Sequence, residues 1–143
     1  MTAHFLALDA DQPQRWAQIK HFHKTHKLAQ PLHSDPLFAL ELDGKILGVA
    51  RFVPVEQACW LRGLFIIESH RRQGLGQQLI ASSLNQLTQP VYAFALPHLA
   101  PFYQSLGFEP QDLSTLIPPL QLLFKRYQAQ KAQLQIWCFN PSR

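Results

Sequence analysis

The chain has 143 residues, 47% of them apolar, and a formal charge of +4. This length predicts a single domain, 1–143, whose core needs no metal or disulfide, and the apolar content excludes a mainly disordered chain. No run approaches 18 apolar residues, no signal-peptide pattern opens the chain and only two cysteines occur, so the sequence predicts a cytoplasmic protein without a membrane span.

The positive charge is local. The stretch 69–108 contains no acidic residue but holds Arg71 and Arg72, and such a field favours a phosphorylated ligand. A nucleic-acid-binding surface usually carries more Lys and Arg, interleaved with aromatic residues. We therefore expect no nucleic-acid partner.

Apolar periodicity and turn residues predict strands and helices along the whole chain. In chain order they are a strand over 3–8, a helix over 13–27, strands over 37–42, 45–53 and 59–67, a helix over 74–87, a strand over 91–96, a helix over 99–106, a strand over 108–110, a helix to about 127 and a strand over 133–139. Strands followed by strands that alternate with helices indicate an α/β protein with a mixed sheet and helices on both faces.

Local signals set several boundaries. Asp43-Gly44 between two apolar runs favours a type I′ hairpin turn, whose central residues need positive φ. Pro54 is expected to end the second strand of that hairpin. Asp11 is expected to cap the first helix, and Ser114 or Thr115 the last one.

The sharpest local pattern is Arg71-Arg72-Gln73-Gly74-Leu75-Gly76, which follows a strand and opens a helix. Glycines leave backbone N–H groups unobstructed, and a helix N-terminus adds unpaired donors and a positive dipole end. The loop therefore predicts a cradle for a phosphate or pyrophosphate, with Arg71 and Arg72 adding charge-assisted contacts. A glycine turn that only packs the helix on the sheet is the alternative.

Two other phosphate-binding motifs fit less well. A P-loop ends in Gly-Lys-Ser/Thr, whereas Gln77 and Gln78 follow Gly76 here. A dinucleotide-binding fingerprint needs a third glycine where Leu79 stands.

The loop resembles that of the GNAT superfamily of acyl-CoA-dependent N-acetyltransferases. The superfamily loop reads Arg/Gln-x-x-Gly-x-Gly/Ala, and Arg71, Gly74 and Gly76 match it. A second superfamily segment, Phe-Tyr-x-x-x-Gly-Phe, matches residues 102–108. The resemblance, which extends over 13–139, implies a mostly antiparallel sheet in which two parallel strands, 61–67 and 91–96, splay apart.

The resemblance also implies acetyl-CoA as the acyl donor. The residues that would bind it are Phe65, Ile66 and Ile67, whose backbone would pair with the pantetheine arm, and Arg71, Arg72, Gln73, Gly74, Leu75 and Gly76, which would hold the pyrophosphate. Tyr103 would protonate the departing thiolate, a role that suits a phenol with a pKa near 10. A tyrosine that merely packs on the sheet is the alternative reading of Tyr103.

Two positions depart from the superfamily pattern. The glutamate that is the general base in many members would stand at Trp60, and the asparagine that often follows the second splayed strand would stand near Leu96. The base is therefore open, with Glu56, His98 or a water relay as candidates.

Two arginines inside apolar strands predict a contact to the acceptor. A buried arginine needs a partner, and Arg51 and Arg62 together could clamp an acceptor carboxylate. The alternatives are pairing with Glu41, Glu56 or the C-terminus, or exposure to solvent. His98 is a third candidate for the acceptor site.

The histidines of the first helix do not predict a metal. His21, His23 and His26 do not share one helical face, and no Cys or Asp completes a ligand set. We interpret them as a solvated helix end near the acceptor cleft.

The sequence thus predicts an N-acetyltransferase that moves an acetyl group from acetyl-CoA to a primary amine of a small, amino-acid-like acceptor. A protein N-terminus or lysine as acceptor and a homodimer stay open. The alternative is an acyl-CoA-binding regulatory module without turnover, which the missing glutamate favours.

Overall fold

The computed structural model describes residues 2–8 and 11–141. Its helices and strands are β1 (His4–Leu8), α1 (Pro13–Thr25), β2 (Leu37–Leu42), β3 (Lys45–Val55), β4 (Ala58–Ile66), α2 (Leu75–Leu84), β5 (Val91–Ala95), α3 (Ala100–Ser105), β6 (Glu109–Gln111), α4 (Pro118–Gln128) and β7 (Gln135–Phe139). The predicted order of elements is confirmed. No helix in the described part of the chain is long and apolar enough to cross a membrane.

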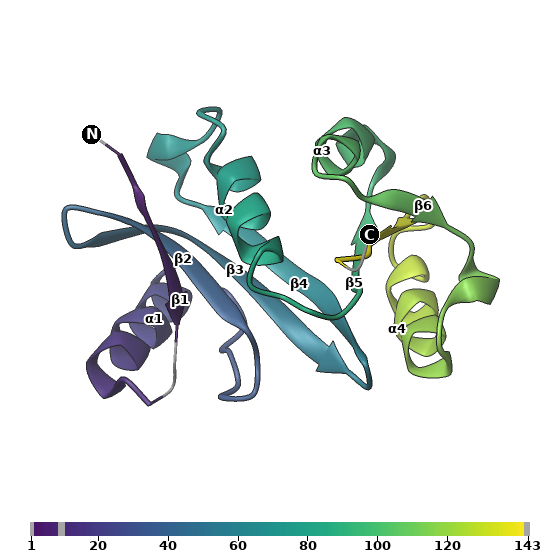
Figure 1. The fold of residues 1–143 in the computed structure, drawn as a ribbon, viewed down its shortest axis with the longest axis horizontal. Helices are drawn as coiled ribbons and strands as arrows, with labels where there is room; N and C mark the ends of the chain where they lie inside the picture. The colour runs from purple at the N-terminus through teal and green to yellow at the C-terminus, as the bar shows by residue number, and fades with distance from the viewer. Residues whose placement is uncertain (1, 9–10, 142–143) are drawn as a thin grey trace.

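The described strands form one seven-stranded sheet in the order β1-β2-β3-β4-β5-β7-β6. Neighbouring strands are antiparallel except for β4 and β5, which are parallel. The predicted mixed α/β sheet, mostly antiparallel with one parallel pair, is therefore confirmed (Figure 1).

Alternation along β3 assigns the helices to the two faces of the sheet. Val49 belongs to the apolar cluster that contains Ile19 of α1. Val53, on the same face of β3, packs against the apolar cluster that contains Leu120 of α4. Phe52 points to the opposite face and packs with Leu79 of α2 and Tyr103 of α3. Helices thus cover both faces, with α1 and α4 on one side and α2 and α3 on the other (Figure 1).

The hairpin turn forms as predicted, but Pro54 does not end β3. Asp43 and Gly44 have φ of 52° and 76°, the positive values that a type I′ turn needs. β3 continues through Pro54 to Val55, because β2 begins only at Leu37, opposite Arg51, and the last part of β3 has only β4 as a partner. A proline is tolerated where one side of a strand is unpaired.

The residues predicted to cap the first and last helices do not occupy the N-cap positions. Gln12 precedes α1 and Ile117 precedes α4, and neither side chain makes a capping hydrogen bond. The Thr115 hydroxyl instead donates to the Asp112 carbonyl, 2.7 Å away, within a separate short turn. Prolines in the first turns of α1 and α4 set the helical φ without a cap.

Gly48 is required by the close approach of β3 and β4. A Cβ atom there would contact Ile66 Cδ1 and lie 2.8 Å from the Phe65 carbonyl oxygen. We expect Gly48→Ala to lower the free energy of unfolding by about 1–3 kcal/mol in urea denaturation, because the end of β4 must shift. The control is Gly63→Ala, where a Cβ would have no neighbour within 4 Å, and equal stability of the two variants would contradict the expectation.

Candidate functional site

The site begins at a bulge in β4. Arg51 of β3 lies opposite Gly63, and Phe52 lies opposite Leu61. Arg62 is thus an extra residue in β4 without a counterpart in β3. A bulge of this kind bends the strand that carries it and increases its twist.

The bend coincides with the separation of the two parallel strands. β4 pairs with β5 only at Cys59 with Val91 and at Trp60 with Tyr92. β5 meanwhile stays paired with β7 over its whole length, from Val91 to Ala95. The edge of β4 that faces β5 is therefore open after Trp60.

The register decides which backbone groups face this opening. The Ile67 N–H donates to the Leu47 carbonyl at 2.8 Å. Because hydrogen bonding alternates along an antiparallel strand, Phe65 and Ile67 direct their backbone groups to β3, and Leu64 and Ile66 direct theirs to the opening. Of the three residues whose backbone was predicted to pair with the pantetheine arm, only Ile66 presents its backbone to the opening. Leu64 also does so but was not predicted, because the register of β4 against β3 is not visible in the sequence.

The glycine loop ends in an uncapped helix N-terminus. Gly74, with φ of 77°, precedes α2, whose first turn has neither a side-chain cap nor an acidic residue. Gln78 is the first residue whose N–H finds a helical acceptor, the Gly74 carbonyl. The N–H groups of residues 75–77 consequently point out of the helix end and form a site suited to an anion.

Arg71 connects this loop to the end of β4. Its Nε donates to the Ile66 carbonyl at 2.7 Å, and its guanidinium lies 5.3 Å from the centre of the Phe65 ring. Arg72 and Gln73 are exposed, and Arg72 has a φ of 64°. The positive charge of the loop therefore lies beside the opened strand edge.

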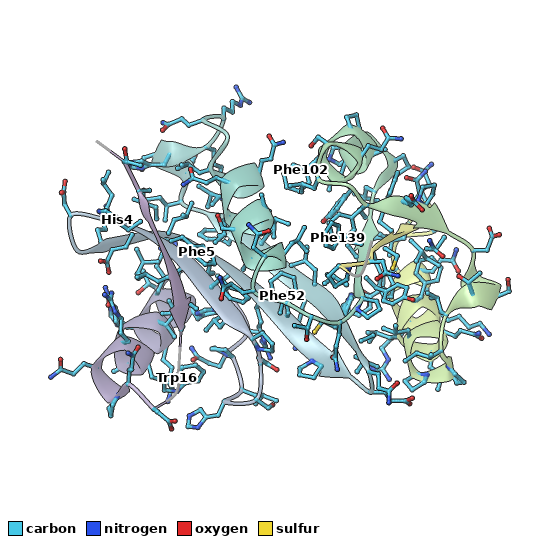
Figure 2. The ribbon with its side chains drawn as sticks, in the orientation of Figure 1. His4, Phe5, Trp16, Phe52, Phe102 and Phe139 are labelled. Atoms are coloured by element: carbon cyan, nitrogen blue, oxygen red, sulfur yellow. The ribbon has the colours of Figure 1, made fainter. Side chains whose placement is uncertain are left out.

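Tyr103 faces a cavity of about 310 Å³ between the separated strands. The cavity is lined by Leu61, Arg62, Gly63, Leu64, Phe94, Leu99, Phe102 and Tyr103. The side chain of Phe102, a residue of α3, lies on the side of that helix that faces α2 (Figure 2), and its ring is 4.0 Å from the place that a Cβ on Gly76 would occupy. Burial raises the pKa of Tyr103 to about 12, so its phenol keeps its proton at neutral pH.

The hydroxyl of Tyr103 is available to a ligand. The side chain is only 7% exposed and packs against the rings of Phe108 and Trp137. Among the described residues no group forms a hydrogen bond with the hydroxyl. Its proton is thus not engaged by the protein.

A second cavity, of about 190 Å³, lies on the α1 face of the same strand. It is lined by His23, Leu28, Ala29, Val49, Arg51, Arg62, Gly63, Leu64 and Phe65. The bulge segment 62–64 lines both cavities. The segment therefore lies between the two cavities, on the edge of β4 that is open after Trp60.

Arg51 has a partner that the sequence did not suggest. Its Nε donates to Asp35 at 2.7 Å and its Nη1 to the Ala29 carbonyl at 3.3 Å. Asp35 also accepts from the Leu32 N–H, so this ion pair, which is buried, fixes the loop over 28–36. Glu41, one of the partners considered above, binds Arg15 instead.

The two arginines are thus brought to one cavity but differ in availability. Arg62 is exposed and forms no ion pair with any residue that the structure describes. Direct binding of an acceptor by Arg62 stays a prediction, whereas the guanidinium of Arg51 is already bound to Asp35.

The candidate bases from the sequence lie apart from this place. His98 is exposed in the short turn after β5 and lines neither cavity. Glu56 is exposed at the tip of the β3–β4 hairpin, also outside both cavities. His23 lines the second cavity, and its position on the same helical stripe as Trp16 and Ile19 was the signal that could have placed it there.

Comparison with known families decides the classification. Residues 33–110, more than half of the chain, match the family described as acetyltransferase (GNAT) domain. The chain belongs to this family. Acetyl-CoA is the acyl donor of this family, so the predicted cofactor and the predicted acyl-CoA-dependent acetyltransferase class are confirmed at the level of the family. No curated protein sequence matches the chain.

Solved structures share the fold at low sequence identity. N-acetylglutamate synthase from Neisseria gonorrhoeae, solved with coenzyme A and N-acetyl-glutamate, is 16% identical with a TM-score of 0.64; the match covers 100% of this chain but only 36% of that protein. The ribosomal-protein-S18-alanine N-acetyltransferase from Escherichia coli is 20% identical with a TM-score of 0.60, over 78% of this chain and 80% of that one. A Bacillus subtilis acetyltransferase in complex with CoA is 14% identical with a TM-score of 0.57, over 78% and 79%.

The raised pKa of Tyr103 predicts a loss of stability in alkali. The unfolded chain releases the phenol proton near pH 10 and the folded chain near pH 12. The free energy of unfolding therefore falls as pH rises through this range, because the unfolded state binds fewer protons than the folded state. Relative to Tyr103→Phe, the native chain should lose about 2 kcal/mol of unfolding free energy between pH 9 and pH 11.5, measured by urea denaturation. If the difference in unfolding free energy between the two proteins stays the same from pH 9 to pH 11.5, the hydroxyl is in contact with water and the prediction is wrong.

Proposed function

We propose that this protein transfers the acetyl group of acetyl-CoA to the primary amine of a small, amino-acid-like acceptor. One observation carries the proposal: the edge of β4 is open after Trp60, and the bulge segment 62–64 on that edge lines cavities on both faces of the sheet. Donor and acceptor can thus approach the same strand segment from two sides. Holding two reactants in this way converts their encounter into an effectively unimolecular step.

The residues that would hold the donor are those at the opened edge of β4 and at the start of α2. The free N–H groups of residues 75–77 suit the pyrophosphate, with Arg71 and Arg72 nearby. The backbone of Leu64 and the N–H of Ile66 suit an extended amide-bearing arm, since they lie on the unpaired edge of β4, whereas the Ile66 carbonyl already accepts from Arg71. Acetyl-CoA would supply a thioester whose carbonyl the amine attacks and whose sulfur leaves as a thiolate.

Tyr103 supports the proposal as general acid. It holds its phenolic proton at neutral pH, faces the cavity in the strand opening, and uses that proton in no contact with the described residues. A positioned acid that protonates a leaving group contributes about 10²–10⁴-fold to a rate.

Arg62 supports an acceptor that carries a carboxylate. Its side chain is exposed at the bulge, where it can bind a carboxylate bidentately without leaving a buried charge behind. Arg51, in the same cavity, adds positive charge while it holds the 28–36 loop. The Neisseria gonorrhoeae structure holds N-acetyl-glutamate, a carboxylated product, on a similar fold.

One observation favours the second candidate, an acyl-CoA-binding module without turnover. No Asp or Glu lines either cavity, and Trp60, at the place of the superfamily glutamate, is buried in the cluster under α4. Binding and turnover must therefore be measured separately.

Acetyl-CoA should stabilise the native chain, and the double variant Gly74→Asp, Gly76→Asp should lose this effect. At 100 times Kd the ligand adds about 2.7 kcal/mol of stability, a shift of several degrees in Tm. Aspartate tolerates the positive φ at Gly74, and a Cβ on Gly76 would meet Leu64 at an ordinary 3.5 Å, so the variant should fold. An equal shift in Tm for both proteins would show that the loop does not bind acetyl-CoA and only packs α2 on the sheet.

Tyr103→Phe should lower kcat for thiol release by about 10²–10⁴-fold and leave the acetyl-CoA shift in Tm unchanged. The measurement uses pairs of primary amines that differ by one carboxylate, and we expect a lower KM for the carboxylated member. An acetyl-CoA shift in Tm without amine-dependent thiol release by the native chain would instead establish the binding module without turnover.

A further inference from the structure

We infer that the Nε2 atom of His23 is the proton acceptor for the acceptor amine in the second cavity. The inference rests on the proposed function and adds to it the missing base. An amine is an ammonium ion at neutral pH and cannot attack a carbonyl until it loses a proton. No carboxylate lines the cavity, so an imidazole is the basic group that the described lining offers.

The hydrogen bonding of His23 fixes its tautomer. Nδ1 lies 2.8 Å from the Ile19 carbonyl oxygen, and a carbonyl oxygen can only accept a hydrogen bond. Nδ1 therefore carries the ring proton, and Nε2 holds a free lone pair. Among the described side chains only the Nε1 atoms of Trp60 and Trp137 are both sealed from solvent and without a partner. Nε2 of His23 has no partner either, so it opens to the cavity that His23 lines.

The surroundings keep this lone pair free. His23 is only 2% exposed. Burial lowers its pKa below 6.5, the Ile19 hydrogen bond opposes that change, and the charge of Arg51 reinforces it. Arg51 on β3 is paired with Asp35 from the 28–36 loop, and Arg62 on β4 is the other charged group of the cavity.

The proton balance is complete with two residues. The ammonium N–H bond breaks, its electron pair stays on nitrogen, and Nε2 binds the proton and later releases it to water. Tyr103, on the other side of the bulge, gives a proton to the leaving sulfur. The second proton that nitrogen loses as the amide forms restores the phenol, so one proton is released per turnover.

The test compares His23→Asn and His23→Gln with His21→Asn. The first two lack the basic atom while keeping a side-chain donor for the Ile19 carbonyl, and the control removes an exposed histidine of the same helix that lines neither cavity. We expect both His23 variants to lose about 10²-fold or more in kcat at pH 7.5. They should keep the acetyl-CoA shift in Tm, and they should lack the fall in rate at acidic pH that we expect of the native chain as His23 becomes protonated.

Two results would overturn the inference. One is a kcat within a few-fold of the His21→Asn control, and the other is a native acidic limb that persists in the His23 variants. Nitrogen-15 NMR of the histidine rings adds a readout independent of turnover. We expect an Nδ1–H tautomer for His23 whose pKa changes when a saturating primary amine is added. A ring protonated at Nε2, or one insensitive to the amine, refutes the role of His23; a responsive ring without turnover refutes only the proposed function.

Discussion

The extra residue in β4 is the constraint on which the site depends. A strand can pair with a neighbour on each side only while its backbone hydrogen-bonding groups stay in register with both neighbouring strands. Arg62 breaks that repeat against β3, and the pairing with β5 ends two residues earlier, at Trp60. The opened edge, the cavity in front of Tyr103 and the wall shared with the second cavity all follow from this one insertion.

Desolvation acts in opposite directions on the two sides of this strand. A phenol is charged when it has lost its proton, and an imidazole is charged when it has gained one. Burial disfavours the charged form of each, so it raises the pKa of Tyr103 and lowers that of His23. At neutral pH the α3 side therefore holds a group with a proton to give, and the α1 side holds a group with a free lone pair.

Some charged groups around the site hold the fold together, and others are left for a ligand. The buried pair of Arg51 and Asp35 anchors the 28–36 loop to β3, and an ion pair so buried must keep both partners. Arg62 remains solvated because the bulge turns it out of the ladder. At the other end of the opening, the uncapped N-terminus of α2 supplies donors without any side-chain charge.

The sequence by itself determined the order of the elements, the Asp43-Gly44 turn and the glycine loop over 71–76, because each depends on residues close together in the chain. Tertiary structure alone decided the partner of Arg51 and the direction of the Leu64 backbone toward the opening. The pairing of Arg51 with Asp35 joins residues on a strand and a loop, and the backbone direction of Leu64 depends on the register between two strands. Such relations arise from which elements pack together, and no local pattern encodes them.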